Sequence, residues 1–202
     1  IIFTTMQKFD NYDDALSTRR NIIVMTDEAH RGQYGLEEKV VTTSKSGEKI
    51  SKVSAKPTLL SEIEIDSGIR FDTGFEELNY VLGGGLTKGS LTLVGGDPGI
   101  GKSTLLLQIC DSLCQNRRVL YISGEESARQ LKLRADRISH QTSDCLIVCE
   151  TSLDQIYVHI KNTNPDLVII DSIQTIFTES IDSSPGSLVQ VRECSASILK
   201  FA

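Results

Sequence analysis

The chain has 202 residues, with 21 Lys and Arg against 27 Asp and Glu, which gives a formal net charge of −6. Apolar residues make up 39% and charged residues 24% of the sequence, a composition typical of globular rather than disordered proteins. No stretch approaches the ~18 consecutive apolar residues of a membrane-spanning helix. The sequence also lacks the start of basic and then apolar residues that is typical of a signal peptide. We therefore expect a cytoplasmic protein with no membrane partner, and the acidic charge does not by itself indicate nucleic-acid binding.

The first predicted element is an apolar strand at residues 21–26 (NIIVMT), followed directly by Asp27-Glu28-Ala29-His30. A strand that ends in DEAH is typical of superfamily 2 helicases, in which Asp27 would hold Mg²⁺ and Glu28 would activate water. With TTMQKF upstream, residues 1–45 resemble the DEAH region of the motor subunit of a type I restriction enzyme. That family has its phosphate-binding loop before this segment, so Asp27, Glu28 and His30 are expected to be vestigial.

Residues 46–58 are polar, contain Gly47 and Pro57 and lack an apolar period, so we predict a linker. From residue 59 onward, short apolar runs alternate with segments of helical spacing. The predicted strands cover residues 90–95, 118–123, 145–149 and 167–171, and the predicted helices cover residues 102–116, 126–139, 152–162 and 187–202, with Ser152 as a capping residue. This alternation predicts an α/β fold for residues 59–202, with a mainly parallel sheet covered on both faces.

The strongest motif follows the first of these strands. Gly96–Ser103 (GDPGIGKS) fits G-x-x-x-x-G-K-[ST], with a predicted strand before it and a predicted helix after it. Gly99 and Gly101 allow a tight turn whose amides can face phosphate, Lys102 can reach the β- and γ-phosphates, and the Ser103 hydroxyl can ligate Mg²⁺. The alternative, a glycine-rich turn without a ligand, fits this complete context poorly. The predicted nucleotide-binding residues are Gly96, Asp97, Pro98, Gly99, Ile100, Gly101, Lys102, Ser103 and Thr104.

Two further strand ends carry acidic residues. Asp171 follows four apolar strand residues, at the end of the strand where ligands of open α/β sheets bind, and we predict that it holds Mg²⁺ through water. Glu125 and Glu126 follow the strand at 118–123, and we favour Glu125 as the catalytic base beside Lys102. The alternative is that both glutamates only stabilise the start of a helix. Gln174 could sense the γ-phosphate or be an ordinary polar loop residue.

The five cysteines lie at positions 110, 114, 145, 149 and 194. Their odd number and the lack of a secretory start indicate reduced thiols. The pairs Cys110/Cys114 and Cys145/Cys149 lie in apolar surroundings and form no CxxC spacing. We therefore expect buried structural thiols rather than a metal site.

Residues from about 56 to 202 resemble the bacterial RadA (Sms) family of DNA repair and recombination ATPases. The resemblance rests on LGGGL at 82–86, the phosphate-binding loop followed by LLLQ, YISGEES at 121–127, QLKLRADR at 130–137, DSIQT at 171–175 and PGSLVQVRE at 185–193. It implies a RecA-like core that uses ATP and Mg²⁺, assembles as a homo-hexamer, acts on single-stranded or branched DNA and works with a RecA-type recombinase. Arg192 would then lie in the region that faces DNA, although a surface salt bridge explains it equally well.

The chain also departs from this family. The four-cysteine zinc module is absent, Asn79 stands where an Asp is expected, and the family's KNRFG motif would follow Ala202. Two incomplete families in one chain predict a truncated or chimeric form, and we treat hydrolysis by this chain as uncertain. The alternatives are a fragment of a restriction-enzyme motor and a KaiC-like module in which ATP mainly supports ring assembly.

Overall fold

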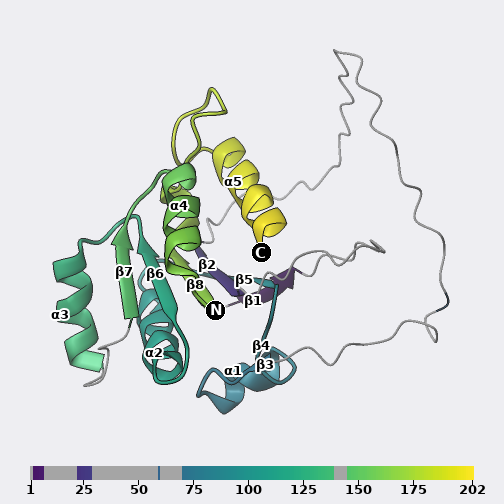
Figure 1. Ribbon diagram of the computed structural model, residues 1–202, viewed down its shortest axis with the longest axis vertical. Helices are drawn as coiled ribbons and strands as arrows, with labels where there is room; N and C mark the ends of the chain where they lie inside the picture. Colours follow the sequence, from purple (N-terminus) through teal and green to yellow (C-terminus); the bar gives the residue numbers. More distant parts are fainter. Residues whose placement is uncertain (1, 7–21, 29–58, 60–69, 139–144) are drawn as a thin grey trace. The chain divides into compact units, whose positions relative to one another are not determined.

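The computed structural model describes residues 2–6, 22–28, 59, 70–138 and 145–202, the first two segments by their backbone (Figure 1). Its main sheet has six strands in the order β1-β5-β2-β8-β6-β7. Their bounds are Ile2–Met6 (β1), Ile22–Glu28 (β2), Leu91–Gly96 (β5), Val119–Ser123 (β6), Cys145–Cys149 (β7) and Leu167–Asp171 (β8). All neighbours pair in parallel except β1, which runs antiparallel to β5. The predicted mainly parallel sheet of a RecA-like core is therefore confirmed.

Five α-helices and a 3₁₀ helix accompany the sheet in the described part of the chain. The α-helices span Glu76–Val81 (α1), Lys102–Cys114 (α2), Ala128–Ile138 (α3), Leu153–Thr163 (α4) and Leu188–Phe201 (α5), and the 3₁₀ helix spans Ile173–Thr175 (η3). A second, two-stranded sheet pairs β3 (Arg70–Phe71) with β4 (Leu86–Thr87) antiparallel. Asn79 of α1 lies close to the residues that follow β3. Its side-chain amide donates to Asp72 Oδ1 at 2.6 Å and accepts from the Thr73 hydroxyl at 2.8 Å. An aspartate at this position would lack the donor to Asp72.

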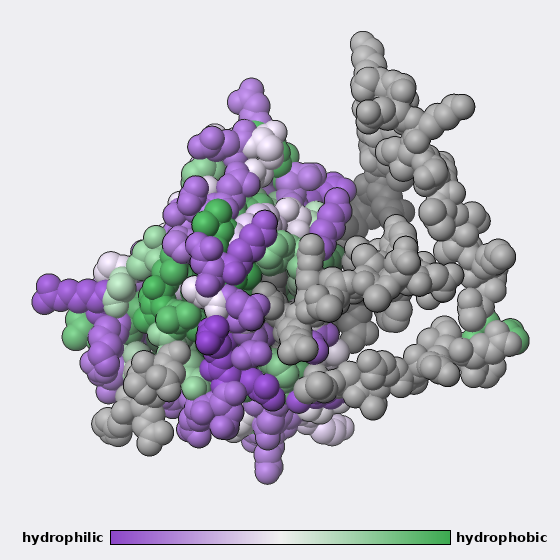
Figure 2. Space-filling view, viewed as in Figure 1, coloured by the Kyte–Doolittle hydropathy of each residue, from purple (hydrophilic) through white to green (hydrophobic). Residues whose placement is uncertain are grey.

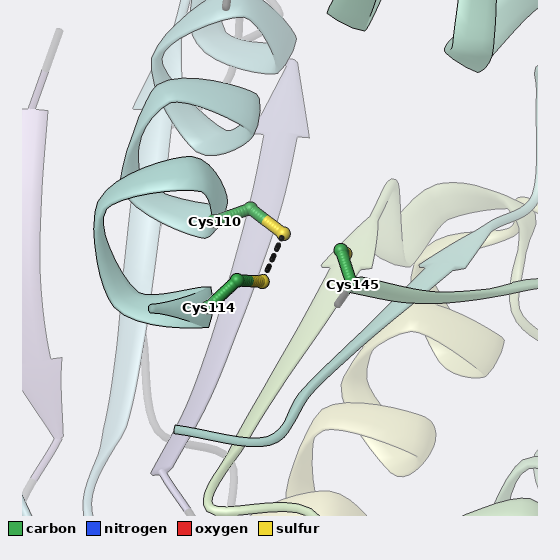
Figure 3. Close-up of side chains that lie close together, drawn as sticks. All are labelled: Cys110, Cys114 and Cys145. Atoms are coloured by element: carbon green, nitrogen blue, oxygen red, sulfur yellow. Dashed lines mark hydrogen bonds between the residues drawn. The ribbon is translucent and has the colours of Figure 1, made fainter. Parts of the chain in front are cut away.

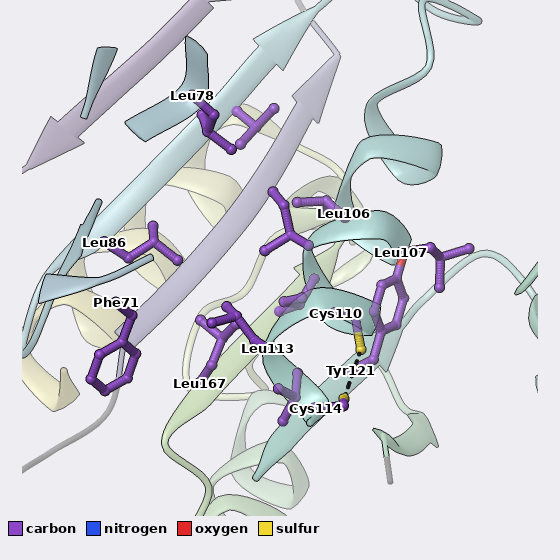
Figure 4. Packing of buried hydrophobic residues seen from close by; sticks show 14 of the residues in the cluster. Phe71, Leu78, Leu86, Leu106, Leu107, Cys110, Leu113, Cys114, Tyr121 and Leu167 are labelled. Atoms are coloured by element: carbon purple, nitrogen blue, oxygen red, sulfur yellow. Dashed lines mark hydrogen bonds between the residues drawn. The ribbon is translucent and has the colours of Figure 1, made fainter. Parts of the chain in front are cut away.

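The central strands bury both faces, because alternate residues of one strand point to opposite sides of a sheet. In β8, Leu167 and Ile169 belong to one core, whereas Val168 and Ile170 belong to the other. The first core contains apolar residues of α1, α2 and α3, and part of it is shown in Figure 4. The second contains residues of α4 and α5. Helices therefore cover both faces of the sheet, as a buried parallel sheet requires.

The predicted elements lie close to the observed ones. The strands predicted at 145–149 and 167–171 match β7 and β8, and the helix predicted at 102–116 is two residues shorter as α2. Ser152 occupies the N-cap of α4, but its side chain makes no capping hydrogen bond. Instead, the Glu150 carboxylate accepts the backbone amides of Thr151 and Ser152, at 2.8 and 2.9 Å. Ser152 is therefore the N-cap residue of α4, as predicted, but its side chain bonds no backbone amide of the helix.

The cysteine prediction holds only in part. Cys110, Cys114 and Cys194 are buried and Cys145 is half-buried, whereas Cys149 is exposed. Cys149 is the last residue of β7, which forms an edge of the sheet and so has neighbours on one side only. The expectation of a buried thiol at position 149 is therefore wrong.

The two strands near the start of the chain join the main sheet. β2 lies between β5 and β8 and is parallel to both, and β1 pairs with the other side of β5. These strands and the elements from β3 onward form one compact unit. The predicted division into residues 1–45, 46–58 and 59–202 stays a prediction, and residues 29–58 lie outside the described residues.

Within the described residues, no helix combines the length and apolar character needed to cross a bilayer. Figure 2 shows a face on which hydrophilic surface surrounds smaller apolar areas. The exposed large apolar side chains include Tyr80 and Val81 at the end of α1 and Leu188 and Val189 at the start of α5.

Because the side chains of β8 fill both cores, shortening one of them should strongly destabilise the fold. Ile169 is fully buried, so Ile169→Ala should lower the free energy of unfolding by about 2–5 kcal/mol through the loss of buried methylene groups and the cavity left behind. Val158 lies on α4 and is 47% exposed, so Val158→Ala should change the free energy of unfolding by less than about 0.5 kcal/mol. Urea titration of both variants measures this, and equal losses would contradict the assignment of β8 to the centre of the core.

Candidate nucleotide-binding site

The phosphate-binding loop connects β5 to α2, and its lysine is folded back onto the loop. Lys102 is the first residue of α2, and its side chain is buried. Its Nζ donates to the carbonyl oxygens of Gly96 at 2.9 Å and Asp97 at 3.1 Å. A buried ammonium needs such partners, and two backbone carbonyls can be exchanged for anionic oxygens at small cost. The lysine is therefore held at the loop in a position from which it can meet a phosphate.

The glycines of the loop are required by backbone conformation rather than by crowding. Gly99 and Gly101 have φ values of 75° and 102°, which L side chains rarely adopt. A Cβ atom built on either residue meets nothing within 4 Å, so open space surrounds the loop. The α2 N-terminus follows at once, and its unpaired backbone amides favour an anion there.

The opposite wall of the site comes from the carboxyl end of β8. Asp171 is buried, and its Oδ2 accepts a hydrogen bond from the Tyr121 hydroxyl at 2.6 Å. Tyr121 lies on β6 and is fully buried, and burial, followed by the negative charge of Asp171, raises the pKa of its hydroxyl. Tyr121 therefore stays a donor at neutral pH and fixes one oxygen of the carboxylate.

Glu125 and Glu126 follow β6 and lie in different environments. The Ser172 hydroxyl donates to Glu125 Oε1 at 2.6 Å, and Glu125 is otherwise exposed. Glu126 forms an ion pair with Arg134 of α3, at 2.7 Å. Gly124, just before them, donates its amide to the Asp171 carbonyl at 3.0 Å, and a Cβ there would overlap the Thr175 side chain. The end of β6 is therefore held tightly against the end of β8.

The phosphate-binding loop, the start of α2 and the ends of β6 and β8 line one pocket of about 360 Å³. The predicted residues that it brings together are Gly99, Gly101, Lys102, Ser103, Thr104, Glu125 and Asp171. The other predicted loop residues, Gly96, Asp97, Pro98 and Ile100, belong to the same loop but do not line the pocket, and Gln174 lies in η3 outside its lining. Arg192 is exposed on α5.

The DEAH residues are described only in part. Asp27 and Glu28 are the last two residues of β2, and in the register of the sheet they lie beside Gly95 and Gly96 of β5. His30 lies outside the described residues. The end of the DEAH strand is thus placed at the same edge of the sheet as the phosphate-binding loop.

Sequence reasoning missed three residues of the site. Tyr121 lies between aliphatic residues in the middle of its strand, which is a signal that a polar atom is needed there. Ser172 follows Asp171 directly and could have been included with it. Arg134 had no local signal, because it is brought to the pocket by α3, eight residues after Glu126.

Comparison with known proteins identifies the family. A model of the family described as AAA domain matches residues 60–187. The chain belongs to this AAA domain family. Similar curated proteins are DNA repair proteins RadA, from Halalkalibacterium halodurans (52% identical over 149 residues, 73% of this chain and 33% of the relative) and Bacillus subtilis (50% over 148 residues, 73% and 32%). The RadA protein of Streptococcus pneumoniae is 46% identical over 166 residues, 82% of this chain and 38% of the relative.

The resemblance to RadA predicted from the motifs is therefore confirmed, and the RadA-like segment is an AAA-type ATPase domain. The chain spans about a third of the length of these RadA relatives. A second family model, for SWI2/SNF2 ATPases, matches residues 1–55, the segment with the DEAH strand.

The Tyr121–Asp171 hydrogen bond gives a test of the RadA-like site before any ligand is added. Tyr121→Phe removes a buried donor to a carboxylate and should lower the free energy of unfolding by about 1.5–3 kcal/mol. Tyr80→Phe, at an 88%-exposed side chain, should leave it within about 0.5 kcal/mol of the unmodified chain. Urea titration at neutral pH compares them, and an unchanged stability in Tyr121→Phe would show that this bond does not hold Asp171.

Proposed function

We propose that this RadA-like domain binds and hydrolyses ATP with Mg²⁺ and that it couples hydrolysis to the processing of single-stranded or branched DNA. The observation that carries the proposal is the pocket in which Lys102 and Ser103 of the phosphate-binding loop meet Asp171 and Glu125. A loop amide cradle, a lysine, a hydroxyl and a carboxylate at the carboxyl ends of strands in one parallel sheet are the parts that phosphoryl transfer needs.

The charges of the pocket support a requirement for a divalent cation. Lys102 and Arg134 contribute two positive charges, whereas Glu125, Glu126 and Asp171 contribute three negative ones. A bare polyphosphate would meet this acidic wall, so a cation must lie between the phosphates and the carboxylates. Ser103 and Asp171 are the proposed residues that hold Mg²⁺, which would neutralise charge that develops on the phosphate oxygens.

Glu125 is the proposed general base, and its environment distinguishes it from Glu126. The Glu126 carboxylate is engaged in an ion pair with Arg134, which holds it away from a water molecule in the pocket. Glu125 instead accepts one hydrogen bond from a neutral serine, is exposed and lines the pocket. Glu125 can therefore orient a water molecule and accept its proton, while Lys102 stabilises the transferred charge.

The DNA-related part of the proposal rests on the RadA relatives, whose names describe them as DNA repair proteins. For the whole protein we propose a homo-hexamer that acts with a RecA-type recombinase. Arg192, exposed on α5, is a proposed DNA-facing residue. A second candidate, a helicase-type motor, is favoured by the SWI2/SNF2 match over residues 1–55 and by the position of the DEAH strand beside β5.

The lysine variant tests nucleotide binding. Lys102→Ala removes a charge-assisted contact worth about 1.5–3 kcal/mol and should weaken Mg²⁺-dependent ATP binding by roughly 10- to 100-fold. Lys161→Ala, at an exposed position near the end of α4, is the matched control and should bind as the unmodified chain does. Calorimetric titration measures both.

Unchanged affinity in Lys102→Ala would overturn the assignment of this loop. Binding that survives Lys102→Ala but is lost in Asp27→Asn would instead favour the helicase-type candidate.

The glutamate variant tests hydrolysis separately from binding. Glu125→Gln keeps the shape of the side chain but removes the base, so phosphate release should fall about 10²- to 10⁴-fold while ATP affinity stays the same. Glu179→Gln, at an exposed position outside the pocket, is the control.

Each variant is assayed with and without single-stranded DNA. Stimulation by DNA is expected in the unmodified chain and in Glu179→Gln. Nucleotide-driven assembly in sedimentation without any response to DNA would favour a KaiC-like assembly module.

A further inference from the structure

Three cysteine thiols gather at the end of α2 that lies away from the phosphate-binding loop (Figure 3). Cys110 and Cys114 lie one turn apart on α2, and Cys145 is the first residue of β7. The three Sγ atoms all lie within 4.8 Å of one another, and those of Cys110 and Cys114 are 3.6 Å apart. Within the described residues, this is the single group of three or more His, Cys, Asp or Glu side chains with such spacing.

We propose that Cys110, Cys114 and Cys145 form a binding site for a thiophilic d¹⁰ metal ion of the zinc type. Thiolates are the ligands that such ions prefer. With zinc–sulfur bonds of about 2.3 Å, neighbouring sulfurs of a tetrahedral site lie about 3.8 Å apart. Small side-chain rotations, without a change in the backbone, would therefore bring the three sulfurs from their observed spacing to that of a tetrahedral site.

A metal ion that binds the cluster must compete with protons for the sulfur atoms. Mutual hydrogen bonding and burial raise the pKa of Cys110. For Cys145, a hydrogen bond with Cys110 favours the thiolate, but hydrogen bonding with Cys114 and burial outweigh it and raise the pKa to about 12. The thiols of Cys110 and Cys145 are therefore protonated at neutral pH in the metal-free chain. One divalent ion that binds all three sulfurs must displace three protons, one from each thiol.

Access and charge balance come from a surface pocket of about 590 Å³ that adjoins the cluster and is lined in part by Cys114, Arg117, Arg118 and Leu146. Three thiolates and a divalent ion carry one net negative charge. The pocket lining contributes two exposed arginines and Asp166, a net charge of +1 that can offset it. Three protein ligands leave a fourth position open, a pattern typical of sites that exchange a ligand rather than of closed structural sites.

The proposed metal site is separate from the nucleotide pocket. Cys114 is twelve residues after Lys102 on the same helix, which places their backbones about 18 Å apart. A bound ion would join α2 to the edge strand β7. It should therefore stabilise the fold without changing ATP affinity, and either proposal can fail without the other.

The direct test is titration of the untagged, reduced full chain with Cd²⁺, followed by the sulfur-to-metal charge-transfer absorption. We expect saturation at one ion per chain, with three protons released. Cys145→Ser, at the half-buried ligand, should weaken binding by more than about tenfold, since even the loss of an outer partner of a metal ligand costs 10- to 100-fold. Cys149→Ser, on the same strand but exposed, is the matched control and should bind as the unmodified chain does.

A second measurement uses only the unmodified chain, in case Cys145→Ser fails to fold. Alkylation followed by mass spectrometry should show Cys145 protected by Cd²⁺ or Zn²⁺ and Cys149 equally reactive with and without metal. Equal Cd²⁺ affinity in the two variants, or no metal-dependent protection of Cys145, would overturn the proposal. A Cys110–Cys114 disulfide on mild oxidation without metal uptake by the reduced chain would do so as well, and would indicate redox chemistry instead.

Discussion

The site depends on one constraint: the carboxyl ends of parallel strands all lie on the same side of the sheet. β5, β6 and β8 run parallel in this sheet, with β2 between β5 and β8, and their alternate side chains fill two separate cores, one against α2 and the other against α4 and α5. Their carboxyl ends therefore meet, and each is followed by a residue of the pocket. The phosphate-binding loop follows β5, Glu125 follows β6, and Asp171 ends β8.

Buried hydrogen bonds then set the geometry of this edge more finely. The Tyr121 hydroxyl fixes the Asp171 carboxylate, and the Gly124 amide ties the end of β6 to the backbone of β8. The bond between Tyr121 and Asp171 is buried, so its loss leaves a polar group without a partner and costs more than the bond itself contributes. The acidic wall of the pocket is thus built before any nucleotide or metal arrives.

Much of this arrangement could be predicted from the sequence, because it depends on local patterns. The four-residue apolar run before Asp171 and the loop GDPGIGKS each specify a strand end and its chemistry within a short window. Contacts between distant elements have no such local pattern. The pairing of Glu126 with Arg134 depends on how α3 packs, and the approach of Cys145 to Cys110 and Cys114 depends on β7 lying beside α2. For the same reason the spacing of the cysteines alone predicted no metal site.

The central claim is that the loop lysine exchanges its backbone partners for phosphate. A crystal structure with Mg²⁺ and a non-hydrolysable ATP analogue tests it most directly. We expect Lys102 Nζ to leave the carbonyl oxygens of Gly96 and Asp97 and to bind phosphate oxygens, with Mg²⁺ between Ser103 and Asp171. A nucleotide bound elsewhere, or a lysine that keeps both carbonyl partners in the complex, would contradict the account.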